Sequence, residues 1–407
     1  MVGKSVYREG TSSYLLEYEQ RKIRDCARTL NHLAKALEPE NEIEKEDVVL
    51  EEEKDRKNII LQKQLKETRT LMADHLKEVA KIVTKSTKEE VHIIWLGERK
   101  EKRIVKLLFS EGICLTDIFL VKKKEERQEV IARLYQSSSS KKKKSITVKE
   151  VAEFLSISLD LRLQPGQRNP IFITDKEENY YFEEEPKYMV LTGFAKAVKE
   201  DENISGDNFS FFETEEKEFI CALSDGMGSG TKAYEESEEV IDKIECLLES
   251  GFEKEKAIRI MNDTFLMEGE EGNRSTLDLC SIDLYTGKAD FLKVGAAYSL
   301  IKRDGYIEKI PSFSLPLGLF SRMEIGRQEK TLLEGDYVLL FSDGVLDYYE
   351  KEEGEEILKE LLANMPYRNP SQIASYLMKH TLAKSQGKVG DDMTILVMGI
   401  WENRGGD

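Results

Sequence analysis

Two apolar segments of this chain are each followed by the same three residues, Ser-Asp-Gly. Phe219–Leu223 is followed by Ser224-Asp225-Gly226, and Tyr337–Phe341 is followed by Ser342-Asp343-Gly344. Each pattern predicts a buried strand with an aspartate at its C-terminal end. A single Asp-Gly is more often an ordinary turn, but two copies after two apolar strands favour a functional site.

Two further aspartate sites stand just before apolar segments. Asp207 precedes Phe209–Phe212, and the pair Asp391-Asp392 precedes Ile395–Met398. In an antiparallel sheet the end of one strand lies beside the start of its neighbour. We therefore expect the aspartates to collect on one edge of a sheet.

Carboxylates gathered in this way would repel one another, and no Lys, Arg or His falls inside the four motifs. Divalent cations are the simplest compensation. Ligands that are all oxygen favour Mg²⁺ or Mn²⁺ over zinc, and two such ions about 3.5–4 Å apart can activate water against a phosphoryl group. Gly226 fits this chemistry because it lets the backbone approach closely and offers its carbonyl as a ligand. The stretch Gly226–Gly230 is not a nucleotide-binding loop, since Thr231 stands where a P-loop needs glycine.

The four motifs resemble the metal-binding motifs of the PPM (PP2C-like) serine/threonine phosphatases, and most closely the bacterial stage II sporulation protein E branch of that family. They read SGDNF from Ser205, LSDGMGSG from Leu223, FSDGV from Phe341 and DDMT from Asp391. The resemblance covers about 186–407, and more weakly part of the chain before it. It implies an α/β (α+β) fold, an αββα sandwich of two antiparallel sheets.

The resemblance also implies a function and a role for each residue. The family hydrolyses phosphoserine or phosphothreonine with metal-activated water. Its implied substrate is a phosphorylated anti-anti-sigma (STAS-type) protein, whose dephosphorylation activates a sporulation sigma factor. By the family's motif, Asp225 would bridge two Mn²⁺ or Mg²⁺ ions, and Gly226 would offer its carbonyl as a ligand. Asp343 and Asp391 would complete the coordination of one ion, and Asp207 would lie by the other. Asp392 is the less favoured ligand of its pair.

The arginine that holds substrate phosphate in eukaryotic relatives has no evident counterpart here. Lys196 and Lys199 lie upstream of Asp207. We expect them to be surface lysines.

The remaining chain predicts three regions: 1–90, helical; 91–185, a small α/β regulatory domain; and 186–407, the phosphatase domain. The helical region suits a hairpin or a homodimer interface, or simply covers its own domain. In the second region we expect strands at 113–121 and 130–135 and a helix opened by a capping box. We also expect a short hairpin from Phe172 and Tyr180–Phe182.

The capping box consists of Thr147 and Glu150. The preceding Ser137–Lys144, four serines followed by four lysines, predicts a surface loop, with a basic interaction site as the alternative. In the third region we expect helices at about 232–250, 254–267 and 370–384. The first two cover a sheet or, as the family resemblance implies, form a switch that moves Asp225.

Composition excludes several classes of protein. Lys plus Arg is 61 and Asp plus Glu is 78, a formal net charge of −17, which argues against nucleic acid as a partner. The five single cysteines predict neither disulfides nor a zinc site. No apolar run approaches the ~20 residues of a membrane helix. Arg8 and Glu9 stand where an export signal would be apolar, so we expect a cytoplasmic protein.

Two alternatives to the enzyme remain open. One is a pseudophosphatase or regulatory scaffold, which would bind a phosphoprotein without hydrolysing it. The other is a structural dimer, which would explain the N-terminal helices but not the carboxylates.

Overall fold

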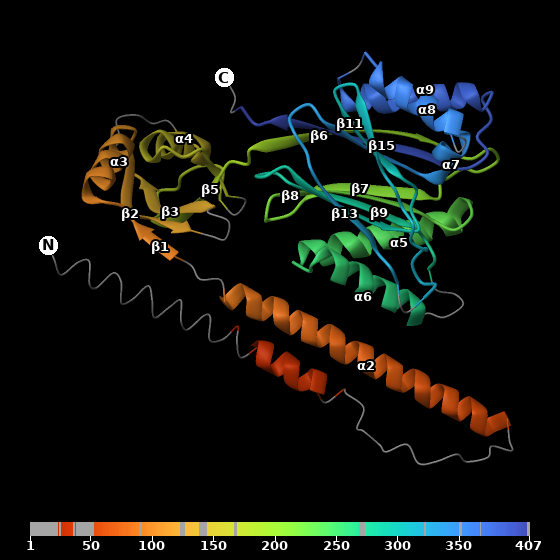
Figure 1. The fold of residues 1–407 in the computed structure, drawn as a ribbon. Coiled ribbons are helices and arrows are strands. Elements are labelled where there is room, and N and C mark those ends of the chain that lie inside the picture. The colour runs from red at the N-terminus through yellow and green to blue at the C-terminus, as the bar shows by residue number, and fades with distance from the viewer. Residues whose placement is uncertain are drawn as a thin grey trace. The chain divides into compact units, whose positions relative to one another are not determined.

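A computed structural model describes most of the chain (Figure 1). The described residues are 23, 26–35, 37, 53–88, 92–122, 127–137, 145–166, 169–267, 273–320, 323–349, 352–366 and 368–404. The chain divides into two compact units: Met1–Asn31 with Val79–Glu185, and His32–Glu78 with Pro186–Asp407. Residues 26–35 and α2 (Glu53–Lys88) are helical. None of the described helices combines the length and the hydropathy needed to cross a bilayer.

The first unit contains a five-stranded antiparallel sheet in the order β1-β2-β3-β5-β4 with two helices. Its elements are β1 His92–Trp95, α3 Glu98–Ser110, β2 Ile113–Lys122, β3 Gln128–Gln136, α4 Val148–Leu159, β4 Leu163–Pro165 and β5 Glu178–Glu184. The two predicted strands are therefore confirmed. One apolar cluster joins the sheet to both helices, with Leu108, Leu155 and Phe182 fully buried.

The predicted capping box is present at the start of α4. Thr147 Oγ1 accepts from the Glu150 N–H at 3.1 Å, and Glu150 Oε2 accepts from the Thr147 N–H at 2.8 Å. The predicted hairpin is wrong: Tyr180–Phe182 pair with β3, Phe182 also pairs with Pro165 of β4, and Phe172 bridges Thr147. The reason is burial, because Tyr180 and Phe182 are fully buried in the sheet core and long-range pairing outweighs the local turn. The tract Ser138–Lys144 lies outside the described residues.

The second unit contains two five-stranded antiparallel sheets. The first has the order β13-β10-β9-β8-β7 and the second β12-β11-β14-β15-β6. The strands are β6 Tyr188–Ala197, β7 Asp207–Glu213, β8 Glu218–Asp225, β9 Leu277–Asp283, β10 Lys288–Val294, β11 Ser299–Arg303, β12 Tyr306–Ile310, β13 Gly326–Thr331, β14 Tyr337–Phe341 and β15 Met393–Glu402. The expected mixed α/β class with antiparallel sheets is confirmed.

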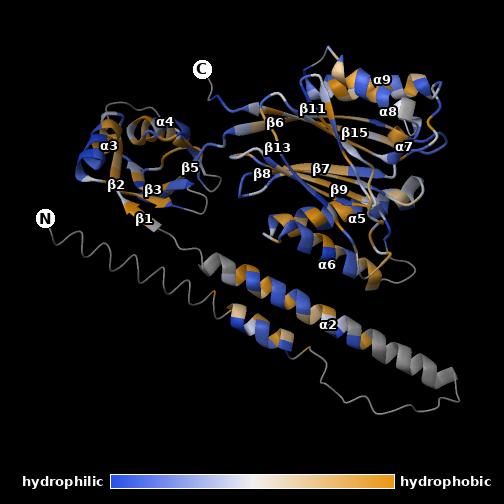
Figure 2. Ribbon diagram, viewed as in Figure 1, coloured by the Kyte–Doolittle hydropathy of each residue, from blue (hydrophilic) through white to orange (hydrophobic). Residues whose placement is uncertain are grey.

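Apolar packing holds the two sheets face to face. One buried cluster takes Leu223 and Phe291 from the first sheet and Val338 and Leu396 from the second. Figure 2 shows apolar residues running along the strands of both sheets. In β15 the eight residues from Met393 to Ile400 are all buried, so both faces of this strand are covered.

Helices lie on the outer faces of the sheets (Figure 1). They are α5 Gly230–Glu249, α6 Lys254–Met267, α7 Asp343–Leu346, α8 Glu352–Ala363 and α9 Pro370–Lys384. The helices predicted at 232–250, 254–267 and 370–384 match α5, α6 and α9. Each of these two helices, α5 and α6, has an apolar face. These faces, which include Val240, Ile244 and Met261, are buried in a cluster with strands of the first sheet. Both helices therefore cover that sheet, and their proposed role as a switch stays a prediction.

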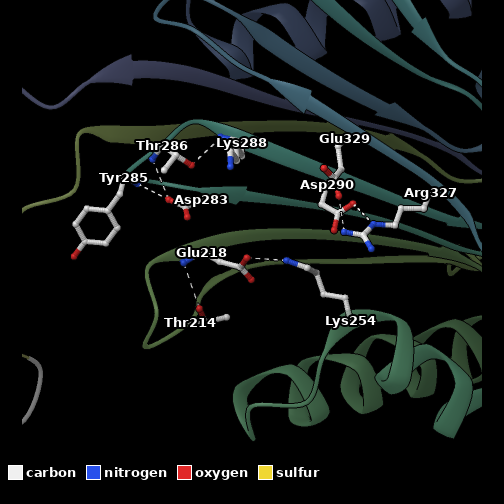
Figure 3. A network of polar contacts seen from close by, with 10 residues as sticks. All are labelled: Thr214, Glu218, Lys254, Asp283, Tyr285, Thr286, Lys288, Asp290, Arg327 and Glu329. Atoms are coloured by element: carbon white, nitrogen blue, oxygen red, sulfur yellow. Dashed lines mark hydrogen bonds and ion pairs between the residues drawn. The ribbon is translucent and has the colours of Figure 1, made fainter. Parts of the chain in front are cut away.

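Polar contacts hold the far end of the first sheet (Figure 3). Lys254 Nζ, at the start of α6, donates to Glu218 Oε1 at 2.7 Å, and Glu218 begins β8. In the turn between β9 and β10, Asp283 Oδ1 accepts from the N–H groups of Tyr285 and Thr286 at 2.8 and 3.0 Å. These contacts anchor α6 and the turn at the end of β8 opposite Asp225.

Candidate active site

Each predicted aspartate lies at a strand end. Asp207 begins β7 and Asp225 ends β8, and the two are register partners. Asp343 is the first residue of α7, two positions after β14 ends. Asp391 stands two positions before β15 begins. Strands β14 and β15 are antiparallel neighbours, and Phe341 at the end of β14 pairs with Ile395 near the start of β15.

The four aspartates form two pairs on two sheets rather than a row on one edge, which corrects the sequence-based expectation. Asp207 and Asp225 belong to the first sheet, and Asp343 and Asp391 to the end of the second. The stacked sheets present these ends together. The carboxyl of Asp225 senses the negative charges of Asp207, Asp343 and Asp391. Strand pairing explains each pair, and sheet packing brings the pairs together.

The backbone of Asp225 is held by Thr276. Its N–H donates to Thr276 Oγ1 at 3.0 Å, and its carbonyl accepts from the Thr276 N–H at 2.9 Å. Ser224 Oγ donates to the Thr276 carbonyl at 2.8 Å. Burial, and then the charges of Asp207 and Asp343, raise the pKa of Asp225 to about 10. The folded chain therefore keeps this carboxyl protonated at neutral pH unless a cation replaces the proton.

Asp207 is fully buried, and neither of its carboxylate oxygens has a hydrogen-bond partner among the described residues. Burial raises the pKa of Asp207 to about 6, although the neighbouring hydroxyl groups of Thr394 and Ser342 act to lower it. An unpaired buried carboxylate is costly, and hard cations offer it the partner that the chain does not. The donor chemistry at this site thus fits Mg²⁺ or Mn²⁺.

Asp391 and Asp392 have different surroundings. Both oxygens of Asp392 are used by backbone, since Oδ2 accepts from the Gly206 N–H at 2.7 Å and Oδ1 from the Lys199 N–H at 3.0 Å. The Asp391 side chain is 42% exposed and lies 3.6 Å from Lys199 Nζ. This difference favours Asp391 as the ligand and gives Asp392 the task of holding the segment before β7.

Lys196 and Lys199, upstream of Asp207, were both expected to be surface lysines, and the structure contradicts this for Lys196. Lys196 is half-buried, its Nζ donates to the Asp207 carbonyl, and burial lowers its pKa. It is therefore not a surface lysine. Lys199 reaches Asp391 as described, so both cations belong to the surroundings of the carboxylates.

Gly226 has a steric reason to be glycine. A Cβ there would lie 2.0 Å from the Ala233 carbonyl oxygen, in the first turn of α5. The Gly226 N–H donates to the Gly206 carbonyl at 3.2 Å. The residue thus lets α5 pack directly against the end of β8.

The carboxylates are gathered but not yet in a coordinating arrangement. Across the parts of the chain that the structure describes, no three His, Cys, Asp or Glu side chains are placed to hold one metal ion together. The predicted ligand set, Asp207, Asp225, Gly226, Asp343 and Asp391, stays a prediction.

Sequence reasoning missed the polar residues behind the carboxylates. A pocket of about 20 Å³ is lined by residues of both sheets, among them Asp225, Thr276, Asp278, Ala297 and Asp343. That volume is enough for one water molecule. Thr276 lies just before β9 and Asp278 is the second residue of that strand. Their spacing of two positions predicts that they face the same side, but not what that side contacts.

Known proteins resemble this chain over its C-terminal half. Residues 215–401 match the family described as Stage II sporulation protein E (SpoIIE), a span that contains Asp225, Asp343 and Asp391 but not Asp207. The chain is 34% identical over 217 residues to Stage II sporulation protein E of Bacillus subtilis, which covers 53% of this chain. It is 32% identical to the solved phosphatase domain of SpoIIE from the same organism, covering 54% of this chain and 96% of that one with a TM-score of 0.45.

Over this C-terminal region the chain belongs to the SpoIIE family of PP2C-type phosphatases. A second solved structure contains the PP2C phosphatase domain and a fragment of the regulatory domain of B. subtilis SpoIIE. It is 27% identical, with a TM-score of 0.63, and covers 88% of this chain and 100% of that one. The fold similarity to SpoIIE therefore extends beyond the phosphatase domain. The chain spans only 26% of the curated B. subtilis SpoIIE.

Proposed function

We propose that this protein is a metal-dependent protein serine/threonine phosphatase with a PPM-type αββα catalytic domain. The observation that carries the proposal is the meeting of two carboxylate pairs from two sheets, one of which contains the buried, unpartnered Asp207. Membership of the SpoIIE family supports it. The family's substrate class, a phosphorylated anti-anti-sigma protein that controls a sporulation sigma factor, is proposed as the substrate here.

The chain's residues would hold two Mg²⁺ or Mn²⁺ ions. Asp225 senses the charges of Asp207, Asp343 and Asp391 and therefore suits the shared ligand, while Asp343 and Asp391 suit one ion and Asp207 the other. Bound divalent cations lower the pKa of water and neutralise charge on phosphoryl oxygens.

The protein's own part is to fix these groups in place. Thr276 and Ser224 hold the backbone of Asp225, and Asp392 ties the segment before β7 to the start of β15. Because Asp225 holds a proton in the absence of cations, metal binding must displace that proton. Metal affinity is therefore expected to rise with pH.

A phosphatase assay on the full chain tests the proposal. The substrate is a serine-phosphorylated STAS-type protein, measured with Mn²⁺, with EDTA, and with EDTA followed by excess Mn²⁺. We expect turnover only with metal and full recovery on its return. Asp343→Asn should remain folded and lose at least a hundredfold in rate, about 3 kcal/mol of transition-state stabilisation.

Two outcomes would contradict the proposal. Turnover in metal-free buffer would exclude the metal-dependent mechanism. Stable binding of the phosphoprotein without phosphate release at saturating Mn²⁺ would instead identify a pseudophosphatase.

A further inference from the structure

A group of three buried polar residues lies between the two sheets of the second unit. Asp278 is on β9, Lys293 on β10 and Ser299 on β11, and their exposures are 1%, 1% and 0%. Asp278 and Lys293 are direct register partners within the first sheet. Ser299 belongs to the second sheet. The group therefore spans the interface between the sheets.

The hydrogen bonds of this group are short and cross that interface. Lys293 Nζ donates to Asp278 Oδ2 at 2.5 Å, to Ser299 Oγ at 2.7 Å and to the Ala297 carbonyl at 2.9 Å. Ser299 Oγ donates to Asp278 Oδ2 at 2.9 Å. An ammonium group has three N–H donors, and all three are used. Lys293 is thus committed to this network and is not available to hold a substrate phosphate.

The network lies directly behind the carboxylates. Asp278 lines the same small pocket as Asp225 and Asp343. Thr276, two residues earlier and just before β9, makes the hydrogen bonds that hold the backbone of Asp225. Ala297, bound by Lys293, lines the pocket as well.

Stability alone does not explain a buried ion pair at this place. Well-packed apolar residues of similar volume often serve a protein interior as well or better. Asp278 Oδ1 is buried without a partner among the described residues, so the network is not optimised for stability either. Charge-assisted hydrogen bonds differ from apolar contacts in fixing distance and direction.

We propose that Asp278, Lys293 and Ser299 are positioning residues, which set the spacing between the Asp207–Asp225 pair and the Asp343–Asp391 pair. They thereby set the affinity of the site for divalent cations. The proposal rests on the proposed function, because it assigns the network to the cation site of that function. None of the three residues is proposed to touch the substrate.

The test compares two double variants. Asp278→Asn/Lys293→Met removes both charges of the network and keeps the side-chain volumes. Its matched control, Arg303→Met/Asp336→Asn, removes an ion pair of the same unit in which Arg303 binds Asp336 at 2.6–3.2 Å and Asp336 is 1% exposed. Asp336 precedes β14 and Asp343 follows it, so the control pair lies at the other end of that strand.

Mn²⁺ binding to the full chain is measured by isothermal titration calorimetry, and thermal unfolding is measured in EDTA. We expect Asp278→Asn/Lys293→Met to melt near the wild type and to bind Mn²⁺ at least tenfold more weakly. The control should keep wild-type affinity whatever its melting temperature. The single variant Lys293→Met should melt lower than the double, since it leaves the Asp278 charge without its lysine.

The possible results distinguish failure of the positioning role from failure of the proposed function. Wild-type affinity in Asp278→Asn/Lys293→Met would overturn the positioning role, as would an equal loss of affinity in the control. A wild type that binds Mn²⁺ but hydrolyses no phosphoprotein would refute the proposed function. The positioning role would then still be decided by the Mn²⁺ affinities of the two double variants. A wild type that binds no Mn²⁺ would overturn both.

Discussion

Replacing Asp225 by asparagine should stabilise the metal-free protein while weakening its metal site. The folded chain raises the pKa of Asp225 from 3.8 to about 10. Between these values the folded state holds a proton that the unfolded state has released. The stability of the wild type must therefore fall as pH rises through this window, by up to about 1.4 kcal/mol per pH unit.

The size of the effect follows from the same pKa. An isolated carboxyl of this kind lowers the free energy of unfolding by about 1.36 kcal/mol for each pH unit above 3.8, the pKa of the unfolded chain. At pH 7 the total loss is about 4 kcal/mol. Asparagine has no carboxyl group to protonate, so the variant lacks this pH-dependent cost. We expect Asp225→Asn to gain about 1–4 kcal/mol at pH 7 in EDTA, the upper value applying if no other carboxyl takes up the proton.

Urea unfolding in EDTA at pH 5, 7 and 8.5 measures this directly. The wild type should lose stability across the series, and Asp225→Asn should lose much less. Added Mn²⁺ should raise the melting temperature of the wild type, because a ligand of the folded state stabilises it, and should have little effect on the variant.

Asp336→Asn is the control, a buried aspartate that is paired with Arg303 and should simply lose stability. The reasoning would be refuted if Asp225→Asn were less stable than the wild type at pH 8.5 in EDTA. An unchanged pH dependence would refute it equally.

Two further predictions follow from the packing. Gly226→Ala places a Cβ 2.0 Å from the Ala233 carbonyl oxygen, so the first turn of α5 must move and Mn²⁺ affinity should fall at least tenfold; calorimetry showing wild-type affinity would contradict this. The fragment Pro186–Asp407 should unfold cooperatively in urea and bind Mn²⁺ like the full chain, since three buried clusters lie wholly within it; a fragment without a cooperative transition, where the full chain has one, would refute the predicted domain boundary.

Local sequence determined the parts of the site that depend on strand ends. An apolar run followed by Ser-Asp-Gly predicts a buried strand with an aspartate at its end, and β8 and β14 are such strands. Helical periodicity likewise predicted α5, α6 and α9, because each has one face buried against a sheet. The capping box at Thr147 is a four-residue pattern and was visible for the same reason.

Tertiary structure decided which strand ends meet. A strand pattern does not name its partner, so the expected hairpin at Tyr180–Phe182 proved to be a pairing with β3, far back along the chain. For the same reason the aspartates were expected on one edge, whereas the chain divides them between two stacked sheets.

The clearest case is the buried pair of Asp278 and Lys293. In the sequence these are an acid and a base in two apolar strands, with no sign that they touch. Only antiparallel register places them opposite each other, and only the packing of the second sheet brings Ser299 against both. Sequence patterns report which groups a strand carries, whereas the spacing of those groups depends on contacts between strands far apart along the chain.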